Sequence, residues 1–237
     1  MQSIYKYISL SSFLLCLAVL TTQSQENKVE KTQEKKKEST LPKVKLLNGF
    51  TVQVDVASLL TTALIHGDSY SMEAGVQFDL KKKYYPIVEL GFAGADKISN
   101  ENVGFKTNGL FGRVGVDINL IKPKKDSKPT NNLFLLGARL GMTNFAYDIT
   151  NVKITDNYWG GTESPDYMNQ KSTKVWFEIV AGVRVEVYKN VYMGWTVRNK
   201  NLLGQDAAGK VFPWYIPGFG INTSNNWGVN YTVGYHF

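Results

Sequence analysis

The sequence holds two histidines, His66 and His236, and they limit the acid–base chemistry that the chain could perform. His66 is followed closely by Asp68 and Ser69. A serine nucleophile, a histidine base and an orienting acid are the groups that hydrolyse acyl esters. Residues so close in sequence seldom form a triad, and Gly67-Asp68-Ser69 has the composition of an ordinary turn. We therefore assign no catalytic residue, and keep a lipid A-modifying enzyme that uses His66 as an alternative.

Metal and cofactor chemistry find little support in the sequence. The single cysteine, Cys16, lies in the N-terminal segment, and two distant histidines cannot supply a transition-metal site. The glycines lie singly in strand-like segments, where they ease curvature, and none forms a phosphate-binding loop. We expect no metal and no cofactor.

Charged residues of the middle and C-terminal parts lie at alternate positions, opposite rows of apolar residues. Side chains at alternate positions of a strand share one face. In a barrel of eight strands that face has room for side chains only, so we expect the charges to neutralise one another as a polar network in the lumen. A narrow pore lined by the arginines is the alternative. The expected network consists of Glu73, Glu89, Arg113, Asp117, Arg139, Glu178, Arg184, Glu186 and Arg198.

Period-2 alternation recurs in eight segments and predicts the elements that position these charges. An all-β, transmembrane, antiparallel up-and-down barrel of about eight strands fits this pattern. A one-residue register slip would turn the charges toward lipid, at about 2–4 kcal/mol for each Arg at the bilayer midplane. The runner-up has ten strands, with an extra hairpin at 147–158, and a soluble lipocalin-like barrel is the non-membrane alternative. The eight segments are about 47–57, 70–80, 85–93, 108–120, 133–143, 175–187, 191–202 and 227–237.

The last segment has the features of an insertion signal for the bacterial outer membrane. Its odd-numbered residues are all apolar or aromatic, and the chain ends on Phe237. A lipid-facing row with aromatic girdles is typical of such strands. The residues that we assign to this signal are Trp227, Tyr231, Tyr235 and Phe237.

Connection lengths agree with a barrel whose two termini lie in the periplasm, since short periplasmic turns and long outward loops are typical. The expected turns are 81–83, 122–132 and 188–190, and the expected loops are 58–69, 94–107, 144–174 and 201–226. Loop 144–174 mixes rigid aromatic and small polar residues, which suits contact with a partner, a glycan or a lipid headgroup. A loop that folds over its own barrel mouth is the alternative. Segment 211–219 instead suggests a cap over the barrel mouth. The candidate contact residues are Tyr147, Tyr158, Trp159, Tyr167, Trp214 and Tyr215.

The N-terminal part predicts export rather than a folded domain. Residues 1–24 have a basic start, an apolar stretch and small residues before Gln25, as in a Sec-type signal peptide. Residues 25–45 contain seven Lys and four Glu with few large apolar side chains, so we expect a disordered periplasmic tail. The net charge of +7 is mild and interleaved with acids, which argues against nucleic-acid binding.

One resemblance adds to these observations. The strings VAGVRVEVYKNVYMGWTVR, PWYIPGFG and WGVNYTVGYHF, within 174–237, resemble a family of uncharacterised Bacteroidota outer-membrane barrels, a domain of unknown function. The resemblance implies a location and a fold and carries no catalytic residue. We predict a monomeric, non-enzymatic barrel, 46–237, in the outer membrane of a Gram-negative bacterium, with loops for surface interaction or envelope integrity. Its partners would be outer-membrane lipid, lipopolysaccharide and the barrel-assembly machinery.

Overall fold

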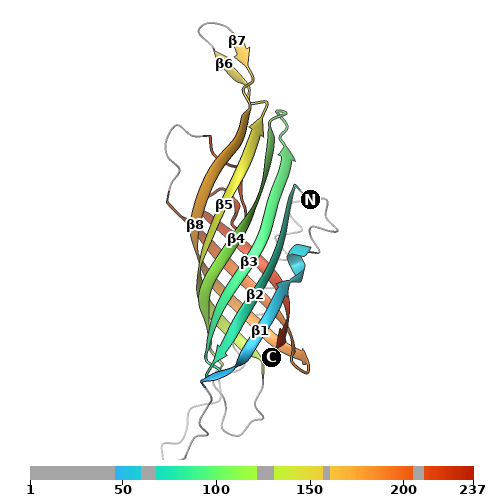
Figure 1. Ribbon diagram of the computed structural model, residues 1–237, viewed down its shortest axis with the longest axis vertical. Coiled ribbons are helices and arrows are strands. Elements are labelled where there is room, and N and C mark those ends of the chain that lie inside the picture. The colour runs from blue at the N-terminus through green and yellow to red at the C-terminus, as the bar shows by residue number, and fades with distance from the viewer. Residues whose placement is uncertain (1–45, 60–67, 122–130, 157–160, 205–210) are drawn as a thin grey trace, which may run out of the picture. The chain divides into compact units, whose positions relative to one another are not determined.

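The protein is a closed antiparallel β-barrel in a computed structural model that describes residues 46–59, 68–121, 131–156, 161–204 and 211–237 (Figure 1). Neighbouring strands follow the order β1-β12-β9-β8-β5-β4-β3-β2, so the eight-stranded up-and-down prediction is confirmed. No helix within the described ranges is both long and apolar enough to span a bilayer. The barrel strands are β1 (Leu47–Asp55), β2 (Ser69–Leu80), β3 (Tyr84–Ile98), β4 (Gly104–Asn119), β5 (Leu133–Thr150), β8 (Tyr167–Tyr188), β9 (Val191–Leu203) and β12 (Asn225–His236).

Several predictions fall outside the described residues. These are the signal peptide at 1–24, the tail at 25–45, and the residues His66, Tyr158 and Trp159. They stay predictions.

The strands alternate as their sequence pattern requires. On β4, Leu110 and Val114 are 71% and 61% exposed on the outer surface, whereas Arg113 and Asp117 are buried in the lumen. Apolar side chains thus face outward and charged side chains face inward, which is the reverse of a soluble barrel.

The barrel has a short-turn end and a long-loop end. At the short-turn end, β2 and β3 are joined by 81–83, as predicted, and β8 and β9 by 189–190, one residue fewer than the predicted 188–190. Residues 122–130 of the predicted turn 122–132 lie outside the described residues. Lys81 and Lys82 have positive φ angles of 55°, as the two central residues of a type I′ turn do, and the backbone N–H of Lys83 donates to the carbonyl of Leu80 at 3.1 Å. At the other end the loop prediction was wrong in part, because β3 and β4 continue until only 99–103 separates them.

The strands extend further than predicted. The prediction stopped early because the polarity of the two faces inverts along the strands. Toward the long-loop end of β5, the inward residues change from Arg139 to the apolar series Phe145, Tyr147 and Ile149, while Asn144 faces outward. The pattern of apolar outward residues stops where this inversion begins, so it marks only part of each strand. Residues 144–150 and 167–174 of the predicted loop 144–174 are therefore strand, in β5 and in the first part of β8.

Two further short pairs lie outside the barrel ladder. Strands β6 (Ile154–Asp156) and β7 (Gly161–Glu163) pair only with each other, at the tip beyond β5 and β8 (Figure 1). The ten-stranded alternative is therefore wrong, although a hairpin does form within this segment. Strands β10 (Tyr215–Ile216) and β11 (Gly220–Ile221) form the second pair, in the part of the chain that connects β9 to β12.

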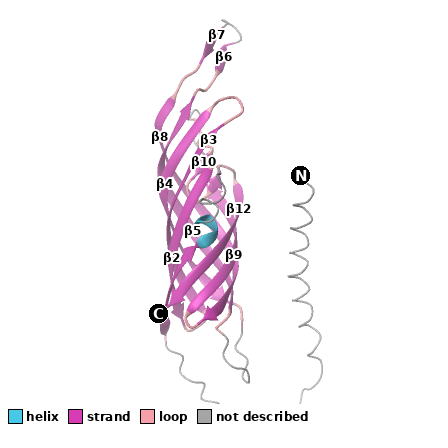
Figure 2. Cartoon of the chain, turned by 90° about the vertical axis from the view of Figure 1, so that its right-hand side faces the viewer, coloured by secondary structure: helices cyan, strands magenta, loops and turns pink. Residues whose placement is uncertain are grey.

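The barrel closes where the first and last strands meet. The ladder between β1 and β12 runs from Thr51↔His236 to Asp55↔Thr232, and β1 then turns into one helical turn at 56–59 (Figure 2). The carboxylate of Asp55 accepts a hydrogen bond from the backbone N–H of Ala57, as in a helix N-cap. The first strand therefore ends two residues before the predicted Ala57.

Candidate functional site

The middle of the barrel lumen is filled by an ionic network whose centre is Glu89 on β3. Arg198 Nη1 on β9 lies 2.8 Å from Glu89 Oε2, and Arg113 Nη1 on β4 lies 3.5 Å from the same oxygen. Arg139 on β5 pairs with Glu89 Oε1 and also with Asp117, at 3.1 Å. These charged residues are all nearly fully buried, so the pairs lie in a low-dielectric environment.

Two further carboxylates, on β2 and β8, complete the network. Glu73 on β2 bridges Arg113 and Arg198, at 2.6 Å and 3.0 Å. Glu178 on β8 lies 2.8 Å from Arg113 Nε and accepts a hydrogen bond of 2.6 Å from the indole N–H of Trp176. Each arginine thus contacts at least two carboxylates, which compensates the cost of burying its charge.

A second polar layer lies next to the network. Gln77 donates to Asp117 Oδ2 at 2.7 Å, and Arg184 donates to Gln53 Oε1 at 2.9 Å. A cavity of about 10 Å³ between this layer and Thr232 has room for one water molecule. A void of that size is too small for a hydrated ion.

The segment 211–222 folds into the barrel from the long-loop end, and we call it the plug. Its backbone contacts the ionic network directly. The carbonyl of Gly218 accepts hydrogen bonds of 2.8 Å from both Arg113 Nη2 and Lys200 Nζ. Gly218 has a φ of +79°, and a Cβ there would lie 2.4 Å from the Phe111 ring. Only glycine therefore fits at this contact.

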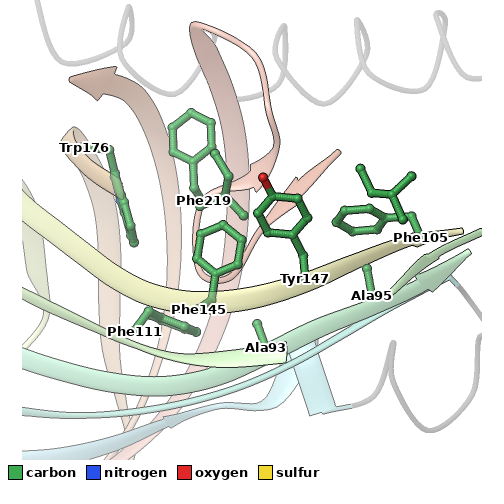
Figure 3. Packing of buried hydrophobic residues seen from close by; sticks show 10 residues of the cluster. Ala93, Ala95, Phe105, Phe111, Phe145, Tyr147, Trp176 and Phe219 are labelled. Carbon is green, nitrogen blue, oxygen red and sulfur yellow. The ribbon is translucent and has the colours of Figure 1, made fainter. Parts of the chain in front are cut away.

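Aromatic packing holds the plug in the long-loop half of the lumen (Figure 3). Phe219 meets Trp176 edge-on, with 5.9 Å between ring centroids, and Trp214 meets Phe105 in the same way. Burial raises the pKa of Tyr215 to about 12. The buried apolar cluster consists of Ala93, Ala95, Phe105, Phe111, Phe145, Tyr147, Ile149, Trp176, Ile216 and Phe219.

The nine residues predicted for the lumen do not all behave alike. Glu73, Glu89, Arg113, Asp117, Arg139, Glu178 and Arg198 lie in the ionic network. Arg184 is buried one layer away. Glu186 is an exception: it is half-buried at the short-turn rim, where it accepts hydrogen bonds from Asn131 and from the backbone of Asn190. The β8–β9 register shifts at this residue, near the end of its strand.

The predicted contact residues also need correction. Tyr147 is on β5 rather than on a loop; it is buried, and its hydroxyl donates to the carbonyl of Val211. Tyr167 is on β8, half-buried against the same apolar cluster. Trp214 and Tyr215 belong to the plug, in agreement with the expected cap over the mouth. None of these four described residues is therefore an open contact point.

Three further residues of the lumen were not predicted as members of the network. Lys200, Gln53 and Gln77 point into the lumen, and all three occupy the inward parity that the strand pattern defines. That parity was the available signal. The contact of Lys200 with a backbone carbonyl 18 residues away had no signal in the sequence.

The four residues assigned to the insertion signal lie on the outer surface or at its edge. Trp227 and Phe237 are 69% and 60% exposed, and the rings of Trp195 and Tyr231 lie 4.7 Å apart. The Phe237 ring stacks on Phe50 at 5.0 Å, and the backbone groups of these two residues exchange hydrogen bonds. The terminal residue thus joins the first and last strands.

Comparison with known proteins adds a family and a solved structure. A family model described as a domain of unknown function, DUF6048, matches residues 4–237. No curated protein matches the chain. The crystal structure of Neisserial surface protein A (NspA) is similar at 12% sequence identity and a TM-score of 0.36, over 81% of this chain and 99% of that chain. Among the described residues, no group of metal-binding side chains is assembled.

Proposed function

Starting from a chain that belongs to the DUF6048 family, we propose a non-enzymatic, integral outer-membrane β-barrel whose lumen is closed and whose long-loop end acts in surface interaction or envelope integrity. The observation that carries this proposal is the inside-out polarity of the barrel. Leu110, Trp195 and Val229 are each more than 60% exposed on the outside, while charged residues fill the inside.

Membrane embedding follows from what water would cost such a surface. Soluble proteins rarely expose contiguous apolar patches larger than a few hundred Å². Here the outward row of each barrel strand is apolar over its middle part. Lipid on the outside and ion pairs on the inside stabilise the two faces together.

A closed lumen follows from its contents. The polar layer, the ionic network and the plug succeed one another along the barrel, and the cavity of about 10 Å³ holds at most one water. A conducting path would require the arginines to leave their carboxylates. The narrow-pore alternative therefore has no support from the geometry.

The inverted ends of β3, β4, β5 and β8 support a role at the surface. Most of their outward residues are polar toward the long-loop end, as in the ion pair of Lys106 with Asp96 at 3.2 Å, and Ile98 is an exception. Polar outward and apolar inward faces suit water, so these ends project beyond the bilayer. They present a rigid edge on which β6 and β7 sit (Figure 1).

Two measurements test this proposal. Fractionation should recover the protein with outer membranes, and its gel mobility should shift on heating, as folded barrels do. Recovery in the soluble fraction without a shift would overturn the membrane assignment. Purified protein in planar bilayers should give no single-channel steps; steady conductance would favour the pore.

The enzymatic alternative is tested separately by mass spectrometry of lipid A from a strain that lacks the protein. We expect acylation and headgroup composition to stay unchanged. A changed pattern that His66→Ala reproduces would make the barrel an enzyme and would exclude the non-enzymatic proposal.

A further inference from the structure

Three asparagines form a hydrogen-bonded cluster on the outer surface of the barrel, which we call the amide triad: Asn199 and Asn201 on β9 and Asn225 on β12. The strands β9 and β12 are neighbours, and Asn225 pairs with Asn201 across the ladder (Figure 2). Odd-numbered residues of both strands face outward, as the exposure of Trp195, Val197 and Val229 demonstrates. The triad therefore lies on the membrane-facing side and not in the lumen.

The triad stands at the edge of the apolar band. Along the β9–β12 ladder the outward pairs run from Tyr231↔Trp195 through Val229↔Val197 to Trp227↔Asn199 and Asn225↔Asn201. Apolar partners thus give way to amides within two steps. Trp227, which is 69% exposed, lies directly across from Asn199. An exposed tryptophan at such a boundary marks the level of lipid headgroups.

The hydrogen bonds within the triad leave some N–H donors and oxygen lone pairs of the three amides for a ligand. Asn225 Nδ2 donates to Asn201 Oδ1 at 2.8 Å and to Asn199 Oδ1 at 3.1 Å. Asn201 Nδ2 donates to Asn199 Oδ1 at 2.8 Å, and Asn199 Nδ2 donates to Asn225 Oδ1 at 3.2 Å. An amide has two N–H donors and two oxygen lone pairs. One N–H each on Asn199 and Asn201, and one lone pair each on Asn201 and Asn225, are not used within the triad.

Adjacent donors and acceptors on uncharged groups match the hydroxyls of a sugar, each of which both donates and accepts. The flat face of Trp227 beside them offers an apolar surface for a sugar ring. A phosphate would instead favour Lys or Arg, and the triad carries no charge. We propose that Asn199, Asn201, Asn225 and Trp227 form a binding site for the sugar headgroup of a glycolipid in the bilayer leaflet at the long-loop end. The site rests on the proposed membrane embedding.

The matched control is on the other side of the barrel. Asn108 on β4 and Asn144 on β5 also face outward near the end of the apolar band. Asn144 donates to Thr173 at 3.2 Å, and neither residue has an exposed tryptophan as its cross-strand partner. The double substitution Asn108→Leu/Asn144→Leu therefore removes as many amides without touching the triad.

The test uses the full chain, folded in a non-ionic detergent and analysed by native mass spectrometry. The probes are digalactosyl diacylglycerol, which has an uncharged sugar headgroup, and phosphatidylglycerol with the same acyl chains. The glycolipid should bind the wild type and the control variant equally. Binding should fall about tenfold in Asn199→Leu/Asn225→Leu, because the two amides together offer the sugar one N–H and one oxygen lone pair. Trp227→Leu should weaken it as well.

Three results would overturn the proposal. These are equal glycolipid binding by triad and control variants, phosphatidylglycerol binding as tight as glycolipid binding, and full competition by free digalactose at equal concentration. The last result would place the ligand in solution. The wild type and each variant are first checked for the heat-dependent gel shift. A wild type without that shift would reject the membrane assignment itself, separately from the binding site.

Discussion

Three arginines contact the carboxylate of Glu89 from three different strands, so one residue links much of the barrel wall. Arg113, Arg139 and Arg198 come from β4, β5 and β9. Removing one member of a buried ion pair leaves a charge without compensation, and this costs more than the pair itself contributes. The network is therefore most sensitive at Glu89.

Glu89→Gln should lower the free energy of unfolding by about 3–5 kcal/mol, because the arginines keep their charge and lose the carboxylate. Denaturant titration of the folded barrel in detergent, followed by tryptophan fluorescence, measures the loss. Glu186→Gln is the control, since Glu186 lies at the rim and its change should stay within about 0.5 kcal/mol. Equal effects at both positions would contradict a central role for Glu89.

At the scale of elements, the plug is positioned by one glycine. Gly218 offers its carbonyl to Arg113 and Lys200, and its positive φ brings the chain against the Phe111 ring. Gly204 also has a positive φ, +84°, but a Cβ there would meet nothing within 4 Å. The two glycines share the backbone strain and differ in the space around them.

Gly218→Ala should destabilise the barrel more than Gly204→Ala by about 1–3 kcal/mol, the usual cost of overpacking a filled core. Both variants bear the penalty of a side chain at positive φ, about 1–2 kcal/mol, so the difference isolates the clash with Phe111. Thermal unfolding in detergent provides the comparison. Equal losses would mean that the plug yields without cost.

The first and last strands form the second critical element. Their ladder ends at Asp55↔Thr232, and Phe237 adds a ring stack and two backbone hydrogen bonds to Phe50. A closed barrel leaves no strand edge unpaired in lipid only if this seam forms. The terminal aromatic residue therefore serves closure as well as its predicted role as a signal.

Phe237→Ala should reduce the fraction of protein that reaches the folded, heat-shifted form in outer membranes. Tyr188→Ala is the control, because Tyr188 is 72% exposed near the same end of the barrel and lies on β8, away from the seam. Pulse-labelling followed by gels without heating would report the folded fraction. Parallel losses in both variants would count against a special role of the terminus.

At the scale of the whole molecule, the outward apolar band should define how deeply each position lies in lipid. Val114 is in the middle of the band on β4, whereas Ile98 is the last residue of β3, beyond the outward Asp96. Both side chains are more than 60% exposed. Their surroundings differ only if the band is embedded.

Val114→Arg should cost about 2–4 kcal/mol in lipid vesicles, and Ile98→Arg about 0–1 kcal/mol, as expected for the bilayer midplane and its interface. Reversible denaturant titration in vesicles measures both. A soluble barrel would show similar small effects at the two sites, and this result would reject the embedding.

The sequence by itself was sufficient for the strand number, the facing of each strand and the luminal position of Glu89, Arg113, Arg139 and Arg198. These features depend on period-2 alternation, which is local and is penalised strongly if it slips. It was insufficient where the polarity inverts. Tyr147 and Phe145 were predicted to lie in a loop. Their part of β5 has apolar inward residues and polar outward residues, which is the opposite of the alternation of a membrane-spanning strand.

Only the tertiary structure decided which luminal charges meet, that Glu186 stays outside the network, and that the plug carbonyl of Gly218 contacts Arg113 and Lys200. It also brought Asn225 beside Asn199 and Asn201. Alternation fixes the face of a side chain, since that is a property of one strand. The partner of that side chain depends on the register between strands distant in sequence and on where the plug folds, and neither is encoded within a single strand.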